Sequence, residues 1–251
     1  MGTDKHINKT SSDHRSAKSQ HPQRDDQKVH TDLAAFYDVD GTLVDANVLH
    51  PYAYYAASAP SLSGKVGRLL KMGASLPLYA WADRQGRKYF NDIFYQNYKG
   101  LSEDRLYVIG QEIFERLLKG RIFADMQTLL RQSKSEGMRQ VLITGNLDMI
   151  IAPLAEYLGV DDWVANRLEF DSAGLATGNL IPPVLAGPEK STWIHTYARQ
   201  HQLDLQRCHA YADSASDIPL LCAVGYPTAV NPDAQLKATA DAHNWPIIWA
   251  R

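Results

Sequence analysis

The hydrophobic positions from Leu33 onward fall into short apolar runs, each bounded by acidic or turn-forming residues. Runs of this kind, apolar over several consecutive positions, are typical of strands buried on both faces of a parallel sheet. The first run, in LAAFYDVDGTLVD, ends at Asp38. Later runs lie in QVLITGN (140–146), CHAYADS (208–214), YPTAVNP (226–232) and WPIIWA (245–250).

Helical patterns occupy most of the intervals between these runs. They cover roughly residues 148–158, 188–201, 217–224 and 232–243. Alternation of strand and helix predicts an α/β fold, here a Rossmann-like, doubly wound and mainly parallel sheet with helices on both faces. Residues 168–181 (LEFDSAGLATGNLI) differ, because a Ser-Ala-Gly turn between two extended stretches favours a β-hairpin.

A long segment without convincing strand patterns separates the first run from the second. We expect residues 47–135 to form a helical cap inserted into a core made of residues 32–46 and 136–251. Within the cap, Ser102 is a plausible helix N-cap, and Gly120 a plausible end to the apolar stripe between them.

Residues 1–31 are polar, mixed in charge and nearly devoid of large apolar side chains. Such a segment cannot offset the entropy of ordering its backbone, so we expect a disordered tail. Four of the nine histidines fall there, but their uneven spacing among charged residues favours a solvated tail over a metal site.

The composition narrows the range of functions. The 251 residues include 26 Lys and Arg against 28 Asp and Glu, and 45% are hydrophobic, as in a folded protein that does not bind nucleic acid. Two cysteines without ligand spacing, Cys208 and Cys222, and a start without a signal peptide predict a cytoplasmic location. The uncharged stretch 46–64 is interrupted by polar residues and prolines, so no transmembrane segment is expected.

Two carboxylates follow the first predicted strand at its carboxyl end, where parallel sheets place their ligands. Asp38 can attack an electrophile, and Asp40 is close enough to transfer the proton of a leaving group. Gly41 lets backbone N–H groups approach a bound anion closely. An acidic turn without catalytic function would be the simpler explanation for a bare DxD.

The string DVDGTL after an apolar strand resembles the first motif of the haloacid dehalogenase superfamily of phosphohydrolases, and the other family motifs follow in order. The second is a strand ending in Thr or Ser, matched by Thr144 in VLITGN. The third is a lysine that opens a helix, matched by Lys190 in GPEKS. The fourth has spaced acids after a strand, matched by Asp213 and Asp217 in YADSASD. Each match alone fits a plain structural role, but all four in sequence favour the family.

The resemblance implies a phosphatase that hydrolyses a phosphate monoester through an aspartyl-phosphate, with Asp38 as nucleophile and Asp40 as general acid and base. It implies a Mg²⁺ cofactor held by the carboxylates of Asp38 and Asp213 and the backbone carbonyl of Asp40. Further implied roles are phosphate binding by Gly41, Thr144, Gly145 and Lys190, and orientation of Lys190 or a metal-bound water by Asp217.

The helical insert between the first two motifs resembles the cap of the phosphoserine phosphatase-like branch, subfamily IB. Phosphoserine phosphatase itself fits less well, because the family glutamate that contacts the substrate ammonium corresponds here to Asn47. Asn47 is the best candidate for substrate selectivity. Other candidates are Tyr52, Tyr54 and Tyr55, which more often form cap core, and Arg84, Arg87 and Lys88, which more often form a solvated face.

The expected substrate is a small-molecule or lipid-like phosphate monoester, while the oligomeric state stays open. Two alternatives remain on the same fold. One is a phosphotransferase that passes the phosphoryl group to an acceptor alcohol, and the other is a catalytically weak binding or regulatory protein.

Overall fold

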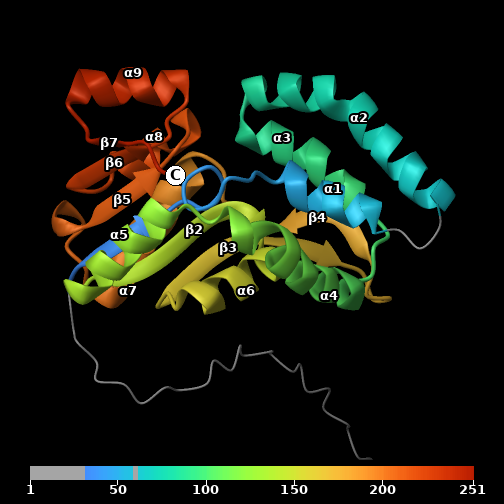
Figure 1. Cartoon of the computed structure of the whole chain (residues 1–251), viewed down its shortest axis with the longest axis horizontal. Coiled ribbons are helices and arrows are strands. Elements are labelled where there is room, and N and C mark those ends of the chain that lie inside the picture. Colours follow the sequence, from blue (N-terminus) through green and yellow to red (C-terminus); the bar gives the residue numbers. More distant parts are fainter. Residues whose placement is uncertain (1–31, 59–61) are drawn as a thin grey trace, which may run out of the picture. The chain divides into compact units, whose positions relative to one another are not determined.

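A seven-stranded sheet forms the centre of this computed structural model, which describes residues 32–58 and 62–251. The strands lie in the order β4-β3-β2-β1-β5-β6-β7, and every neighbouring pair is parallel except β3 and β4 (Figure 1). The predicted α/β fold is confirmed, whereas the expected tail at residues 1–31 lies outside the described residues. The strands are β1 (Ala34–Tyr37), β2 (Arg139–Leu147), β3 (Asp162–Phe170), β4 (Ala176–Ile181), β5 (His209–Ala212), β6 (Tyr226–Val230) and β7 (Ile247–Ile248).

The helices fall largely where the hydrophobic pattern predicts them. The α-helices are α1 (Leu49–Ala57), α2 (Leu62–Gln85), α3 (Arg87–Phe94), α4 (Glu103–Ile113), α5 (Ala124–Ser135), α6 (Asp148–Leu158), α7 (Pro188–His201), α8 (Ile218–Leu221) and α9 (Ala234–His243). Shorter helical turns are η1 (Tyr95–Tyr98), η2 (Phe114–Leu118, a π-helical turn), η3 (Lys119–Arg121), η4 (Leu205–Arg207) and η5 (Ala215–Asp217). In the described part of the chain, no helix is both long enough and apolar enough to cross a membrane.

Each face of the sheet is covered by its own hydrophobic core, because successive residues of a strand point to opposite faces. On one face Tyr37 packs in the same cluster as Met126 of α5 and residues of α6. On the other face Phe36 clusters with Ile194 of α7 and Leu236 of α9. This covering explains why the strands read as short continuous apolar runs.

Strand β3 begins earlier than the predicted hairpin. Its first residues, from Asp162, pair in parallel with β2, and its last residues, from Arg167, pair in antiparallel with β4. The hairpin was correctly expected at 168–181, but the first half of β3 carries Asp162 and Asn166 among its apolar residues. That mixture conceals a buried strand from a search for apolar runs.

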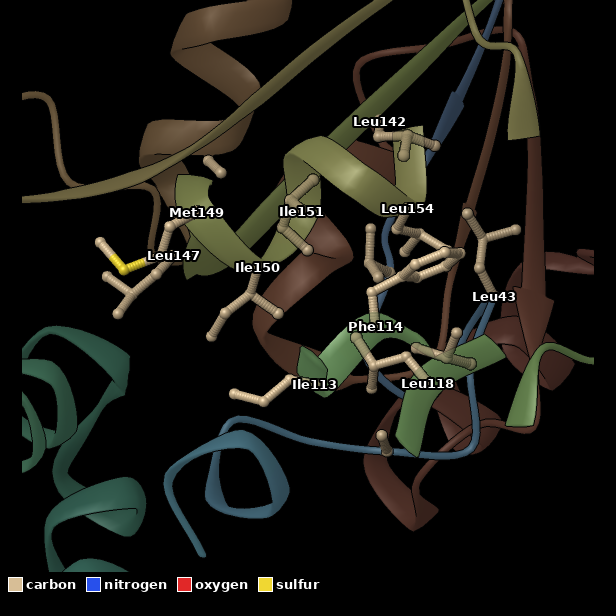
Figure 2. Packing of buried hydrophobic residues seen from close by; sticks show 14 of the residues in the cluster. Leu43, Ile113, Phe114, Leu118, Leu142, Leu147, Met149, Ile150, Ile151 and Leu154 are labelled. Atoms are coloured by element: carbon tan, nitrogen blue, oxygen red, sulfur yellow. The ribbon is translucent and has the colours of Figure 1, made fainter. Parts of the chain in front are cut away.

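Helix α4 begins as expected at Ser102, whose hydroxyl accepts a hydrogen bond from the Arg105 backbone N–H. The helical path continues through η2 and η3 instead of forming one α-helix to Gly120. Its apolar side packs on α6, and Figure 2 shows Ile113, Phe114 and Leu118 facing Ile150, Ile151 and Leu154. A Cβ placed on Gly110 would lie 2.2 Å from the backbone oxygen of Met149, so only glycine permits this close approach.

An aromatic cluster joins α1, α2, α3 and η1. Tyr52 of α1 lies 5.3 Å from Tyr98 and 5.7 Å from Phe94, measured between ring centroids. Tyr52 and Tyr55 are both buried there and do not line the pocket described below. Both residues thus lie in a hydrophobic core and not in the pocket.

Candidate active site

The carboxyl ends of three strands meet where the direction of winding changes. Strand β1 pairs with β2 on one side and β5 on the other, and such a switch point opens a crevice for a ligand. Asp38 follows β1, Gly145 lies near the end of β2, and Asp213 follows β5. All three line one pocket together with Asp40 and Lys190.

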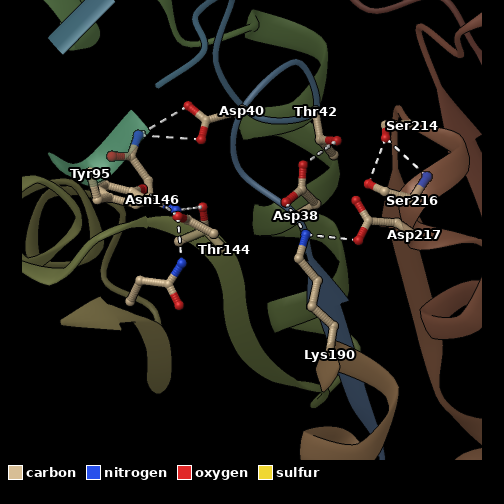
Figure 3. A network of polar contacts seen from close by, with 12 residues as sticks. Asp38, Asp40, Thr42, Tyr95, Thr144, Asn146, Lys190, Ser214, Ser216 and Asp217 are labelled. Atoms are coloured by element: carbon tan, nitrogen blue, oxygen red, sulfur yellow. Dashed lines mark hydrogen bonds and ion pairs between the residues drawn. The ribbon is translucent and has the colours of Figure 1, made fainter. Parts of the chain in front are cut away.

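Lys190 holds two carboxylates inside this pocket. Its ammonium lies 2.6 Å from Oδ1 of Asp38 and 2.8 Å from Oδ1 of Asp217, and all three side chains are buried (Figure 3). Burial by itself favours the neutral amine, but the charges of Asp217 and Asp38 outweigh it and raise the pKa of Lys190. The other Asp38 oxygen, Oδ2, accepts a hydrogen bond from the Thr42 hydroxyl at 3.2 Å. The Asp38 carboxylate is therefore fixed from both sides.

Asp40 has a different environment from Asp38. The side-chain amide of Asn146 lies 3.2 Å from each Asp40 carboxylate oxygen (Figure 3). Burial and the charge of Asp38 raise the pKa of Asp40 to about 7, against the opposing effect of the Asn146 hydrogen bonds. A carboxyl group with such a pKa can both donate and accept a proton near neutral pH. Asn146 stands inside the quoted VLITGN motif, but sequence reasoning gave it no role.

The carboxylates of Asp38, Asp213 and Asp217 form an acidic cluster in which one oxygen from each lies within 4.8 Å of the others. Burial and the neighbouring charge of Asp38 raise the pKa values of Asp213 and Asp217, because Lys190 alone does not neutralise the group. Hard oxygen donors with excess negative charge fit a divalent cation such as Mg²⁺. The cluster also includes Asp217, which was expected to orient Lys190 or a metal-bound water without binding the metal directly.

Gly41 supports this cluster instead of lining the pocket. Its φ is +80°, and a Cβ on it would lie 2.2 Å from Oδ2 of Asp213. Thr144 also lies outside the pocket lining. Its buried hydroxyl accepts a hydrogen bond from the backbone N–H of Asn146 at 3.0 Å. Phosphate binding by Gly41 and Thr144 therefore stays a prediction.

A buried asparagine from β3 joins the second and third motif segments. The amide nitrogen of Asn166 donates to the Gly145 carbonyl at 2.8 Å, and its oxygen accepts from the Leu185 N–H at 2.7 Å. Tyr95 donates to the same Gly145 carbonyl at 2.8 Å. Both residues position the pocket wall, and both were missed because their distance from the site along the sequence hides the contact.

The segment between β1 and β2 contributes another wall through Asn47, Arg87 and Asn91. The Asn47 side chain also accepts a hydrogen bond from the Leu49 N–H at the start of α1, so its orientation is fixed by the backbone. Arg84 and Lys88 do not line the pocket. Arg87, Phe90 and Asn91 lie on one face of α3 and line the pocket, whereas Lys88 is exposed.

Comparison with known proteins agrees with this geometry. A model of the haloacid dehalogenase-like hydrolase family matches residues 35–221. The chain belongs to this family.

Three curated relatives carry different names. An "Inhibition of morphological differentiation protein" of Streptomyces azureus is 33% identical over 60% of this chain and 54% of its own length. A "Phosphoserine phosphatase SerB1" of Mycobacterium tuberculosis is 30% identical over 85% of this chain and 70% of its own length. A "Histidinol-phosphatase" of Neisseria meningitidis is 26% identical over 85% and 97%, respectively. The chain thus spans about half of the Streptomyces relative.

Two solved structures share the fold. A protein of unknown function from Bordetella pertussis superimposes with a TM-score of 0.76 at 20% identity, covering 86% of this chain and 98% of that one. A phosphoserine phosphatase with a phospho-aspartyl intermediate analogue gives a TM-score of 0.64 at 21% identity, covering 86% and 92%. Both confirm the predicted fold class.

Proposed function

We propose that this chain is a Mg²⁺-dependent phosphatase that hydrolyses a phosphate monoester through an aspartyl-phosphate on Asp38. The observation that carries the proposal is the contrast between two carboxylates of one pocket. Asp38 is fixed by Lys190 and Thr42, whereas Asp40 has a pKa of about 7. An ionised carboxylate beside a carboxyl group that exchanges protons suits nucleophilic and acid–base work, respectively.

The carboxylates of Asp38 and Asp213, with the backbone carbonyl of Asp40, would hold the metal. When bound, Mg²⁺ would neutralise negative charge on the phosphoryl oxygens and on the surrounding carboxylates. Asp217 contacts Lys190 at 2.8 Å and is close enough to the same cluster to orient a water at the metal.

In the first step an Asp38 oxygen forms a bond to phosphorus while the bond between phosphorus and the ester oxygen breaks. Asp40 gives its proton to that departing oxygen, so the leaving group departs as a neutral alcohol. Lys190 offsets the charge of the attacking carboxylate and of the phosphoryl group, which otherwise repel each other. The backbone N–H of Gly145 is a further donor for a phosphoryl oxygen.

In the second step Asp40 takes a proton from a water molecule. The water oxygen bonds to phosphorus, and the bond from phosphorus to the Asp38 oxygen breaks. Inorganic phosphate leaves, Asp38 is again a carboxylate, and Asp40 is again protonated.

The cap residues favour a leaving group without an ammonium group. Arg87 brings a positive charge to the wall, and Asn47, which we propose as a selectivity residue, is neutral. The acids that line the pocket are the ones to which we assign roles in the phosphoryl chemistry, so none is left to pair with a substrate ammonium. We therefore propose a small or lipid-like monoester with a polar or anionic group beside Arg87, in contrast to phosphoserine or histidinol phosphate.

The test measures phosphate release from an aryl phosphate and a panel of sugar, amino-alcohol and lysolipid phosphates, with and without Mg²⁺. Asp38→Asn should abolish release, while Asp45→Asn, an exposed acid in the same loop, should keep it. Borohydride reduction of the trapped intermediate should modify Asp38 alone. Activity retained by Asp38→Asn in a preparation free of other phosphatases would refute the mechanism.

The same protein preparations and panel of phosphate esters also test the two alternatives, a phosphotransferase and a binding or regulatory protein. A phosphotransferase would yield a new phosphate ester when acceptor alcohols are added. A binding or regulatory protein would retain affinity for a phosphate ester without releasing phosphate from any of the panel.

A further inference from the structure

One side of helix α2 packs against neighbouring helices, and on the other side large apolar residues are exposed to solvent. Residues 65, 68, 72, 75, 79 and 82 recur at spacings of three and four and form the packed side. Within that set Tyr79 and Ala82 are buried, and the Arg68 guanidinium donates to the Tyr55 hydroxyl at 2.9 Å. Neighbours of α2 in the fold are α1 and α3.

The opposite side of α2 carries an exposed apolar stripe, defined here as Leu62, Val66, Leu69, Leu70, Leu76 and Trp81. At 3.6 residues per turn these six positions fall within an arc of about 140° of the helix circumference. Leu62 is 78% exposed and Leu70 67% exposed. Trp81 contacts Tyr89 of α3 edge to face, with 5.9 Å between ring centroids, and this extends the stripe with a second half-exposed aromatic.

Figure 1 shows α2 at the outer edge of the cap, with α1 and α3 beside it. In the part of the chain that the structure describes, the stripe is thus left open to solvent. Contiguous exposed apolar residues on a folded domain are a common mark of an interaction site.

Basic residues accompany the stripe. Residues 62–88 contain six Lys and Arg but a single acid, Asp83, and no Asp or Glu occurs between Asp45 and Asp83. Of the six, Lys65 and Arg68 belong to the packed side and Arg87 lines the pocket. This bias is local, because the whole chain has 26 basic against 28 acidic residues. Lys71, Arg84 and Lys88 are exposed. Arg84 falls within the arc of the stripe, and Lys71 lies about 80° beyond its edge.

The charge pattern decides between three possible occupants. A second copy would bring an equally basic surface against the first, which is unfavourable. Residues 1–31 contain almost no large apolar side chains and both charge signs, so they match neither the stripe nor its basic border. An anionic lipid surface matches both, because its headgroups attract Lys and Arg while its acyl region accepts Leu and Trp.

We propose that α2 lies in the interface of an anionic lipid bilayer, with the apolar stripe inserted and the basic residues at the headgroups. The inference is independent of the proposed chemistry and would hold for a catalytically inert chain. Helix α2 also lies between the segment containing Asn47 and the helix containing Arg87, and both of these residues line the pocket.

Cosedimentation of the full chain with vesicles tests the proposal. Binding is expected to vesicles of phosphatidylcholine with phosphatidylglycerol, with much weaker binding to phosphatidylcholine alone and a decrease as salt rises. Leu62→Glu/Leu70→Glu should weaken binding at least about tenfold. Val108→Glu/Trp249→Glu adds the same two charges at exposed apolar positions elsewhere and should bind as wild type does. Lys71→Gln and Arg84→Gln should each weaken binding roughly fivefold.

A second readout is the fluorescence of Trp81, obtained as the difference between wild type and Trp81→Phe. It should shift to shorter wavelength when anionic vesicles are added. Asp38→Asn should bind like wild type, so loss of phosphatase activity leaves this test unaffected.

Three results would overturn the proposal. One is wild-type protein that stays in the supernatant with anionic vesicles at low salt, and another is equal impairment of the α2 and control variants. The third is a concentration-dependent dimer that Leu62→Glu/Leu70→Glu dissociates, which would assign the stripe to a second copy.

Discussion

The ammonium of Lys190 lies 2.6 Å from Oδ1 of Asp38, and the sequence separates these residues by 152 positions. Both side chains are buried, and Lys190 also forms an ion pair with Asp217. Removing the Lys190 ammonium would leave the carboxylates of Asp38 and Asp217 without the cation that they contact.

Lys190→Met should therefore lower both catalysis and stability. We expect kcat/KM for phosphate esters to fall at least about 100-fold, since one charge that stabilises the transition state is lost. In Mg²⁺-free buffer the free energy of unfolding should fall by about 3 kcal/mol, because buried carboxylates lose their partner. Urea unfolding measures this, with Lys237→Met as control. Its exposed pair with Asp241 should contribute under about 1 kcal/mol. Equal losses in both variants would contradict the prediction.

Divalent metal should stabilise the folded chain through the acidic cluster. Adding Mg²⁺ is expected to raise the thermal unfolding midpoint of wild type, because a ligand that binds only the folded state stabilises it. Asp213→Asn should remove most of this increase, and Asp45→Asn should preserve it. Scanning calorimetry without any substrate gives the answer. An unchanged midpoint in wild type at millimolar Mg²⁺ would argue against a metal site here.

His209 should make the protein less stable in mild acid. Its ring stacks on Tyr226 at 4.7 Å between centroids, and burial lowers its pKa below the usual value of 6.5. The unfolded chain therefore binds this proton at a higher pH than the folded one. The stabilising effect of a neutral His209 is complete above the unfolded pKa and is lost as pH falls below it.

The comparison is between wild type and His209→Gln, by urea unfolding at about pH 7.5 and about pH 5.5. Wild type should lose more stability between the two pH values than the variant. All other titrating groups contribute to both proteins and cancel in the difference. An equal loss in both would show that His209 does not contribute.

Gly110→Ala should destabilise the contact between α4 and α6. A methyl group there meets the Met149 backbone oxygen at 2.2 Å, so the helices must separate. We expect a cost of about 1–3 kcal/mol in the free energy of unfolding. Gly120→Ala is the matched control, because its added Cβ meets open space. A neutral result at Gly110 would mean that α4 shifts freely on α6.

Local pattern was enough to predict much of the fold. Helices α6 and α7 span 148–158 and 188–201, as the spacing of apolar residues predicts. Strand β3 was only half recognised, since Asp162 pairs with Arg139 at one end and Asn166 is buried for its hydrogen bonds at the other. Polar residues with a structural partner are indistinguishable from loop residues until that partner is known.

The sequence likewise predicts some residues of the candidate site and not others. Asp38, Lys190, Asp213 and Asp217 were predicted to meet, because they match the four ordered motifs of the family that the sequence resembles. Arg87 was named only together with Arg84 and Lys88, and Asn91 was not named, because their approach to the pocket depends on how α3 packs. Phosphate binding by Thr144 stays a prediction, since its hydroxyl accepts a hydrogen bond from the backbone N–H of Asn146 and keeps its own proton to donate.

The origin of the pocket wall in α3 and in the loop before α1 has an evolutionary consequence. The groups that we assign to phosphoryl chemistry are carried by strand ends and the start of α7, whereas Asn47, Arg87 and Asn91 belong to an insertion between β1 and β2. Substitutions within the insertion can exchange one accepted ester for another while the catalytic carboxylates stay in place. Divergence of substrate among relatives that share the four motifs is the expected result, and names given to those relatives transfer poorly from one to the next.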